Sequence, residues 1–381
     1  TTTLNFSGVS SQTGITNIVS GTAFGLGATY FGSVTLAQGA TLAAASLNLN
    51  GKLGLPAASP TLATGNIVTA LSLNANASSS VNMDTNTTSF GTITLAGAGN
   101  VTIYGANADF GAANITSTDL GYTGTLTLAT TNAAAAIDGT ATGVLTGVDV
   151  LDISIAAGIP VVTLPAVTGG GTFTVKHAPA TAGVAGAITV TQSGGSTADN
   201  LIVSLGALST GAGNVDAAST ESITIASGGA ASGTDTVARV QGPITLGATE
   251  TLTLTGAGAV TVTGLATADT IIATSVGGAI TIGDLTNTAG TTTFTGGAGN
   301  TTISAGTGNA NTNVTTGVGN DDITTGTGDD IIRTSNGTAT IDAAAGADVV
   351  VGGTGVDNIT GGPGADTMTG AGGIDTFNFT N

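Results

Sequence analysis

Apolar and polar side chains alternate in short runs along most of this chain. Examples are TITLAGAGNVTIYG at 92–105, LTGVDVLDIS at 145–154 and TESITIAS at 220–227, and Gly, Asn or Asp interrupts or ends the runs. A period of two residues is typical of half-buried β-strands, and these turn-forming residues favour tight connections. The pattern therefore predicts short strands joined by tight turns.

The alternating runs also resemble one another. TITLAGAGNVTIYG at 92–105 and TLTLTGAGAVTVTG at 251–264 match at most positions, although they lie far apart in the chain. No extended amphipathic helix and no strand–helix–strand unit is predicted, since only AAAAI at 133–137 favours a helical turn. A short strand–turn unit that recurs in this way predicts an all-β chain, and a solenoid rather than a sandwich.

The strongest repeat begins at Gly296 and has a period of nine residues. Its third glycine recurs from Gly299 to Gly373, and every step is nine residues except the step from Gly308 to Gly319, which carries two extra. Most repeats carry an aspartate two residues after this glycine, and an apolar residue expected to be buried follows two residues later at Ile323, Ile332, Val350, Ile359, Met368 and Phe377. The aspartate is replaced in three repeats, by Thr301, Ala310 and Ala339.

This repeat has the chemistry of a calcium site. Glycines let the backbone adopt positive φ, so that a turn can direct several carbonyl oxygens to one point, and the aspartate adds an anionic oxygen. Ca²⁺ accepts six to eight oxygens in loose geometry, whereas Mg²⁺ needs a tighter octahedron and Zn²⁺ prefers Cys or His. We therefore expect Ca²⁺ as the cofactor, bound by Asp321, Asp330, Asp348, Asp357, Asp366 and Asp375 with Gly328, Gly346, Gly355, Gly364 and Gly373.

Composition and charge exclude other partners. The chain has 22 acidic and 4 basic residues, which give a formal charge of −18. Nucleic-acid binding and attraction to anionic membranes both require basic surfaces, so neither is expected, whereas cations are attracted. No membrane-spanning helix is expected, because Asp and Pro residues interrupt the most apolar stretch, at 148–167. Apolar residues make up 40% of the chain, which argues against disorder.

Residues 296–381 resemble the RTX (repeats-in-toxin) calcium-binding β-roll, whose signature is G-G-x-G-x-D-x-U-x. The resemblance implies a right-handed parallel β-solenoid in which two repeats make one turn, so that each ion lies between repeats n and n+2. Asp321, Ala339 and Asp357 would then follow one another on one side, where sites near Ala339 should be weak or missing. On this reading the aspartates pair as Asp330 with Asp348, Asp348 with Asp366, and Asp357 with Asp375.

Calcium should also control folding. Without it, stacked aspartates repel and glycine-rich turns lose much entropy on ordering. The repeats should therefore fold only at extracellular calcium, where such modules bind the ion with a Kd of about 10⁻⁴–10⁻³ M. The resemblance further implies that the protein leaves the cell unfolded by type I secretion. We therefore expect an extracellular protein at the bacterial cell surface.

Catalysis is not expected. A metalloprotease needs H-E-x-x-H, but the chain has a single histidine, His177, which is expected at the surface or in a turn. The G-x-S-x-G motif of lipases is absent, and four scattered bases do not suit a β-helix lyase. A glycosidase could use Asp149 and Asp152, but aromatic residues, which bind sugars, are only 3% of the chain.

Residues 1–295 resemble the Thr/Ala/Gly-rich, calcium-dependent β-solenoid part of bacterial surface-layer (S-layer) proteins of the Caulobacter type. The resemblance rests on units such as VDVLDIS and TESITIAS and on the low Lys and Cys content. It implies a secreted structural subunit that assembles with itself into a lattice and contacts cell-surface polysaccharide, without inserting into a membrane. The expected regions are a first solenoid at 1–142, a second at 143–295 and the β-roll at 296–381.

Two other functions remain open at this point. A surface adhesin or a matrix filament of similar composition is the nearest alternative to a lattice subunit. An ice-binding module is a third, because Thr-rich flat faces and sequences such as GTGDD at 326–330 occur in such modules. The irregular repeats argue against the flat array that ice would need.

Overall fold

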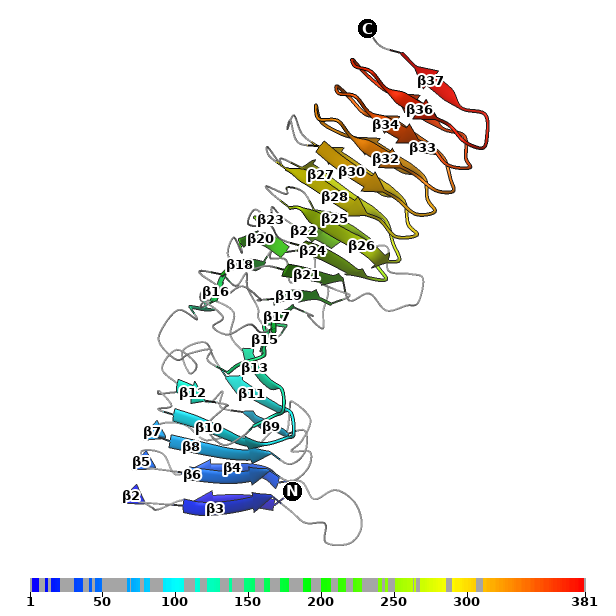
Figure 1. Cartoon of the computed structure of the whole chain (residues 1–381). Coiled ribbons are helices and arrows are strands. Elements are labelled where there is room, and N and C mark those ends of the chain that lie inside the picture. Colours follow the sequence, from blue (N-terminus) through cyan, green and yellow to red (C-terminus); the bar gives the residue numbers. More distant parts are fainter. Residues whose placement is uncertain are drawn as a thin grey trace. The chain divides into compact units, whose positions relative to one another are not determined.

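In the computed structural model, every described element is a β-strand (Figure 1). The structure describes residues 2–6, 11–12, 15–20, 31–36, 41–42, 45–49, 67–68, 70–75, 79–82, 92–105, 114–116, 122–130, 137–138, 147–154, 161–164, 172–177, 188–192, 200–206, 212–216, 222–227, 239–241, 244–245, 251–262, 264, 268–285, 290–305 and 311–379. No helix within these ranges has the length and apolar character that crossing a membrane requires.

The chain divides into two compact units. The first is Thr1–Pro165 with Phe173–Lys176, and the second is Ala166–Thr172 with His177–Asn381. This partition differs from the three regions expected from the sequence, with boundaries after residues 142 and 295, and that division stays a prediction. The two units are described separately below.

The strands of the first unit form parallel ladders, and the longest are β9-β11-β13-β15-β17 and β3-β6-β8-β10-β12. The alternation of the sequence explains them, because Ile103, Leu128 and Leu151 are fully buried in successive strands of one ladder. The strands are β1 Thr2–Phe6, β2 Ser11–Gln12, β3 Ile15–Ser20, β4 Phe31–Leu36, β5 Thr41–Leu42, β6 Ala45–Leu49, β7 Ile67–Val68, β8 Ala70–Ala75, β9 Ser79–Asn82, β10 Thr92–Gly97, β11 Val101–Gly105, β12 Asn114–Thr116, β13 Leu126–Thr130, β14 Ile137–Asp138, β15 Val150–Asp152, β16 Val161–Leu164 and β17 Thr172–His177.

The second unit is a coil of two parallel sheets, and its strands stack as successive rungs in Figure 1. One sheet runs β19-β21-β24-β26-β28-β30-β32-β34-β36, and the other runs β18-β20-β22-β25-β27-β29-β31-β33-β35-β37. The strands are β18 Ile188–Gln192, β19 Asn200–Leu205, β20 Ala212–Asp216, β21 Ser222–Ser227, β22 Arg239–Gln241, β23 Ile244–Thr245, β24 Thr251–Gly256, β25 Val260–Val262, β26 Thr270–Val276, β27 Ile280–Leu285, β28 Thr291–Thr295, β29 Thr301–Ala305, β30 Asn311–Thr315, β31 Asp321–Thr324, β32 Ile331–Arg333, β33 Ala339–Asp342, β34 Val349–Val351, β35 Asn358–Thr360, β36 Thr367–Thr369 and β37 Thr376–Asn378.

Consecutive strands from β24 to β37 alternate between the two sheets, so each of these turns contributes one strand to each sheet. This arrangement confirms the all-β solenoid with parallel strands that the sequence predicts. The register places Ile323, Ile341 and Ile359 in one column of the second sheet, and each lies two nonapeptide lengths after the one before it. Two nonapeptides therefore make one turn of the coil.

The core of the second unit is a seam of aliphatic side chains between its sheets. Its members include Leu252, Leu254, Val260, Val262, Ile271, Ile280, Ile282, Phe294, Ile303, Val314, Ile323, Ile332, Ile341, Val350 and Ile359, none more than 1% exposed. The expected burial of Met368 and Phe377 is not complete. Met368 is half-buried and Phe377 is 38% exposed, because they lie on β36 and β37, the last described strands, which no further described turn covers.

Candidate metal centre

The glycines of the repeats lie where a side chain would collide with the neighbouring turn. We number the nonapeptide positions one to nine, so that the aspartate is position six. At position two, Gly353 and Gly362 have φ of +104° and +96°, in the left-handed region. A Cβ on Gly362 would overlap the carbonyl oxygen of Ala344, one turn of the coil earlier. At Gly353 and Gly362 the backbones of successive turns therefore approach too closely for a side chain to fit without strain.

Position four packs in the same way, and it contains the glycines predicted from the sequence. A Cβ on Gly346 would overlap the carbonyl oxygen of Gly328, and one on Gly364 would overlap that of Gly346. The same relation joins Gly373 to Gly355. Carbonyl oxygens of one turn thus lie directly against the next turn, in a column that runs along each side of the coil.

The aspartates form two rows, one beside each sheet. The first row contains Asp330, Asp348 and Asp366, and the second row contains Asp321, Asp357 and Asp375 with Ala339 in the gap. Neighbours within a row are linked across one turn of the coil, because each carboxylate accepts a hydrogen bond from the backbone N–H of the preceding member. The distances to Oδ1 are 2.8 Å from Asp330 N to Asp348, 3.1 Å from Asp348 N to Asp366, 2.8 Å from Ala339 N to Asp357 and 3.1 Å from Asp357 N to Asp375.

The structure therefore brings together the three pairs of aspartates expected from the sequence. In each pair, the backbone of one aspartate is hydrogen-bonded to the side chain of the other. The register of the strands agrees, since Ile331 pairs with Val349 directly after the first pair of aspartates. The two residues of a pair therefore lie at the same place on adjacent turns, so a cation between these turns could be reached by both carboxylates.

The second oxygen of three of these carboxylates has no protein partner. Oδ2 of Asp330, Asp348 and Asp357 is buried and accepts no hydrogen bond from the described residues. Each of these side chains is only 1% exposed. A buried carboxylate oxygen without a partner is strongly unfavourable, and a cation beside it removes the penalty. These residues therefore fit a bound metal ion.

The electrostatics of the rows agree with this reading. The pKa of Asp330 is raised to about 6, mainly by burial and also by the Asp348 and Asp329 carboxylates, against the opposing effect of hydrogen bonds from Thr325 and Thr312. Burial also raises the pKa of Asp348 and of Asp357, and Asp366 and Asp375, respectively, add to these shifts. The fold thus holds carboxylates in a place that disfavours their charge, as a site built for a cation does.

The donor set indicates which cation fits. Within the described ranges, no three Asp, Glu or His side chains converge on a single point. An ion between two turns would therefore take most of its ligands from backbone carbonyl oxygens, which the glycine turns stack close together. Oxygen donors in a flexible, carbonyl-rich set are typical of Ca²⁺.

Comparison with known families agrees with the geometry. Residues 315–350 and 342–377 match the family model described as the RTX calcium-binding nonapeptide repeat. These residues are RTX repeats. Such repeats bind calcium, and proteins that carry them are typically secreted, so the chain carries a calcium-binding domain of a secreted RTX type. No curated protein and no solved structure matches the chain.

The calcium ion supplies charge neutralisation and cross-linking when it is bound. The residues of the RTX repeats, which we call the RTX array (residues 315–377), do the rest. Asp348 lies in the middle of the first row and contacts both of its neighbours, so it would hold an ion on either side. The glycines at position four leave no room for side chains between successive turns. A bound cation would compensate the buried charges of the stack.

Asp321 differs from the other buried aspartates in its hydrogen-bond partners. Its Oδ1 accepts a hydrogen bond of 2.9 Å from Thr301 N, and its Oδ2 accepts one of 2.5 Å from the Thr316 hydroxyl. The side chain is 3% exposed. Burial raises the pKa of Asp321, and the hydrogen bonds from Thr316 and Thr301 oppose that shift. Its role as a calcium ligand stays a prediction.

Two features of the array were not predicted from the sequence. Position one lies against the aspartate of its own repeat, because a Cβ on Gly352 would overlap Oδ2 of Asp357. Position five forms a second ladder in the opposite direction. Asp329 Oδ1 accepts from Ala347 N at 2.8 Å, and Asn320 Oδ1 accepts from Thr338 N at 3.2 Å. The signal in the sequence was the recurrent Asn or Asp directly before position six.

The register of one repeat differs from the expected one. Ala310 was expected at an aspartate position, but it lies outside the described residues. Thr312 occupies the place before Asp330 instead, since Thr312 N donates to Asp330 Oδ1 at 2.6 Å and Val314 pairs with Ile332. The two extra residues of this repeat therefore precede Thr312 rather than follow it.

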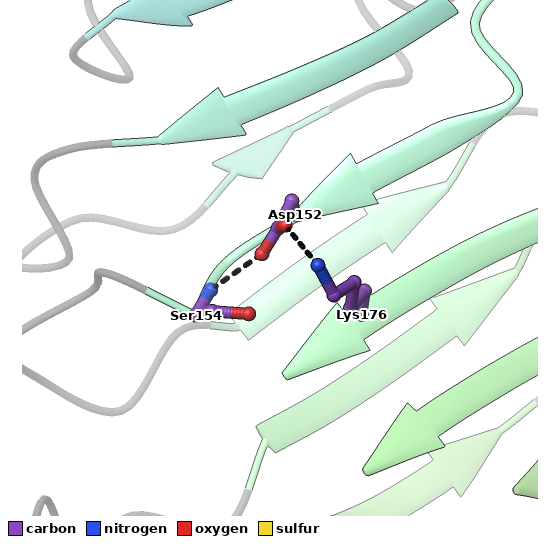
Figure 2. A network of polar contacts seen from close by, with 3 residues as sticks. All are labelled: Asp152, Ser154 and Lys176. Atoms are coloured by element: carbon purple, nitrogen blue, oxygen red, sulfur yellow. Dashed lines mark hydrogen bonds and ion pairs between the residues drawn. The ribbon is translucent and has the colours of Figure 1, made fainter. Parts of the chain in front are cut away.

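The residues considered for catalysis take part in the packing and hydrogen bonding of strands β13, β15 and β17. Asp152 forms an ion pair of 2.8 Å with Lys176 on the adjacent strand and accepts a hydrogen bond of 3.0 Å from Ser154 N (Figure 2). Asp149 Oδ2 accepts a hydrogen bond of 2.7 Å from Leu126 N. The expectation that His177 lies at the surface or in a turn is wrong. It is 1% exposed, because alternate residues of β17 are buried and His177 is one of them.

Proposed function

We propose that this protein is a secreted, calcium-stabilised structural subunit that assembles with copies of itself into a bacterial surface layer. The carrying observation is the RTX array, whose buried and unpartnered carboxylate oxygens make the order of the coil dependent on a cation. The rest of the second unit continues the same parallel coil. The composition adds support, since the chain has no Cys and one His among 381 residues, and these types serve most often in catalysis.

The proposed mechanism has two steps. The aspartate rows would hold calcium, which would supply the positive charge that their buried carboxylates lack, and the glycine turns would then stack into the coil. The ordered coil next presents unpaired N–H and C=O groups at a strand edge, and a strand edge is a natural site for pairing with another chain. The protein is not an enzyme on this proposal, and calcium links folding to arrival outside the cell.

The partners follow from the charge and from the outward-facing side chains. The formal charge of −18 favours cation-mediated contacts between copies and disfavours nucleic acids and anionic membranes. Outward residues such as Thr293, Thr302 and Thr340 are exposed and neutral, and they suit hydrogen bonding to a second copy or to cell-surface polysaccharide.

Electron microscopy of the purified protein tests this proposal. We expect ordered sheets in calcium at about 10⁻³ M and separate particles after addition of a chelator. Soluble monomers in both conditions would refute assembly. Filaments in place of sheets would favour a matrix subunit, and calcium-dependent binding to cells or glycans without any lattice would favour an adhesin.

A further inference from the structure

Asp321 stands apart from the other buried aspartates of the RTX array. Asp330, Asp348 and Asp357 each have one oxygen hydrogen-bonded to a backbone N–H and one buried oxygen that accepts no hydrogen bond from the described residues. Asp321 is buried to a similar degree, at 3% exposure, yet both of its oxygens have protein donors. Unlike the other three, its carboxylate therefore has no oxygen that lacks a protein donor.

We propose that Asp321 does not bind calcium, and that Thr316 is the residue that excludes the ion. The Thr316 hydroxyl donates to Asp321 Oδ2 at 2.5 Å, in the place that is left open beside the other three carboxylates. A neutral hydroxyl thus substitutes for the cation. Calcium sites begin at Asp330 in the first row and at Asp357 in the second row.

Threonine at position one does not close a site in every repeat. Thr325 and Thr334 occupy the same position as Thr316, but each donates its hydroxyl to the position-one carbonyl of the next turn, at Ala343 and Gly352 respectively. The Thr325 side chain still lies close enough to Asp330 to lower the pKa of its carboxyl, yet Asp330 Oδ2 accepts no hydrogen bond. The acceptor of the threonine hydroxyl, and not the presence of threonine, distinguishes Asp321 from the aspartates that keep an unpartnered oxygen.

The neighbours of Asp321 in the second row also lack charge. Thr301 precedes it by one turn and is fully buried, and Ala339 follows it by one turn and is 1% exposed. A cation beside Asp321 would therefore have one carboxylate, each oxygen of which already accepts a hydrogen bond, where the Asp357 and Asp375 pair offers two. The hydrogen bond from Thr316 and the absence of a second carboxylate both disfavour a cation beside Asp321.

The turn that contains Asp321 separates the upstream turns of the coil, which do not need calcium, from the downstream turns, which do. Strand β31 pairs with β29 on its upstream side and with β33 on its downstream side. It can therefore form without calcium on the upstream turns and serve as the surface on which calcium-bound turns stack. The inference rests on the RTX repeats and holds whether or not the protein forms a lattice.

The number of bound calcium ions tests the inference. Native mass spectrometry and equilibrium dialysis at saturating calcium would compare D321N with D357N, two substitutions of equal size and charge at the same repeat position in the same row. We expect D321N to retain the ion count of the unmodified protein and D357N to lose at least one ion. Loss of an ion in D321N would overturn the inference.

A second pair of variants tests Thr316 while Asp321 stays in place. T316G removes the hydroxyl and restores the glycine found at position one of three later repeats, so we expect one additional ion. T316S keeps the hydroxyl and should leave the count unchanged. An unchanged count in T316G, or a gain in T316S equal to that in T316G, would refute the role of Thr316. This pair remains informative even if D321N does not fold.

Discussion

Residues 251–305, which we call the upstream turns, and the RTX array belong to the same unit and the same two sheets, yet they are stabilised differently. In the upstream turns, the residue two places before Val262, Ile282 and Ile303 is apolar or bears a hydroxyl, whereas half-buried Asp269 holds this place before Ile271. In the array this residue is a buried aspartate such as Asp348. The same buried position of the coil can therefore hold either an uncharged side chain or a carboxylate together with a cation.

The two regions also differ in the length of their turns. The paired core residues Ile271 and Phe294 lie further apart in the chain than the next pair, Phe294 and Val314, and both intervals are longer than two nonapeptides. From Val314 onwards the interval is constant at two nonapeptides. Apolar packing is non-directional and tolerates extra residues in a turn, whereas an ion shared by two turns fixes the distance between them. A constant period is therefore the mark of the cation-dependent region.

Removal of calcium should produce the largest difference between the upstream turns and the RTX array. In chelator, we expect strands β34–β37 to lose protection from hydrogen exchange and approach the rate of an unfolded peptide, because their charges are uncompensated. The upstream turns should stay protected, since their buried positions are mostly neutral. Hydrogen exchange with mass spectrometry of the full chain measures both regions at once. Simultaneous loss of protection in both regions would contradict the distinction.

Neutralising one central carboxylate should have the next largest effect. D348N removes a charge that belongs to two adjacent pairs, so we expect a loss of about 3 kcal/mol of calcium-dependent stability. D322N is the matched control, because Asp322 is exposed on β31 and its replacement should change stability by less than about 0.5 kcal/mol. Chemical unfolding in calcium measures both variants, and equal effects would argue against a site at Asp348.

The pH should act on the two calcium states with opposite sign. The pKa of Asp330 is raised to about 6 in the fold, against about 3.9 in an unfolded chain. The calcium-free fold therefore binds a proton more tightly than the unfolded chain does. Its stabilisation is complete below about pH 4 and is lost as the pH rises through about 6.

With calcium, protons compete for the same carboxylate, so acid should weaken ion binding and lower stability. Thermal unfolding at pH 5 and pH 7.5 tests both signs. We expect a higher unfolding temperature at pH 5 in chelator, and a higher one at pH 7.5 in calcium. The same sign in both conditions would show that the aspartate rows do not control the response.

The sequence was sufficient for the period, the parallel coil and the facing pairs of aspartates. These depend on glycine and aspartate spacing, which a linear pattern records. The direction of the Thr316 hydroxyl was not predictable, because Thr316 and Thr325 occupy the same repeat position and differ only in which acceptor lies closer. The register at Thr312 and the burial of His177 depend likewise on which turn lies beside which, and local sequence does not contain that information.

The smallest effect is expected at position two, where two repeats have alanine although the backbone adopts the positive φ that favours glycine. Ala344 and Ala371 have φ of +60° and +67°, a conformation that costs alanine more than glycine. We expect A344G and A371G each to stabilise the calcium-bound array by about 0.5–1 kcal/mol, since relief of strain is partly offset by the entropy of the unfolded glycine. The opposite change, G362A, should destabilise it by more than about 1 kcal/mol, because the new Cβ meets the carbonyl oxygen of Ala344. Thermal unfolding in saturating calcium separates the two signs. If alanine and glycine proved equivalent at all three positions, close approach of the turns would not be what selects glycine there, and the upstream turns and the array would differ in charge alone.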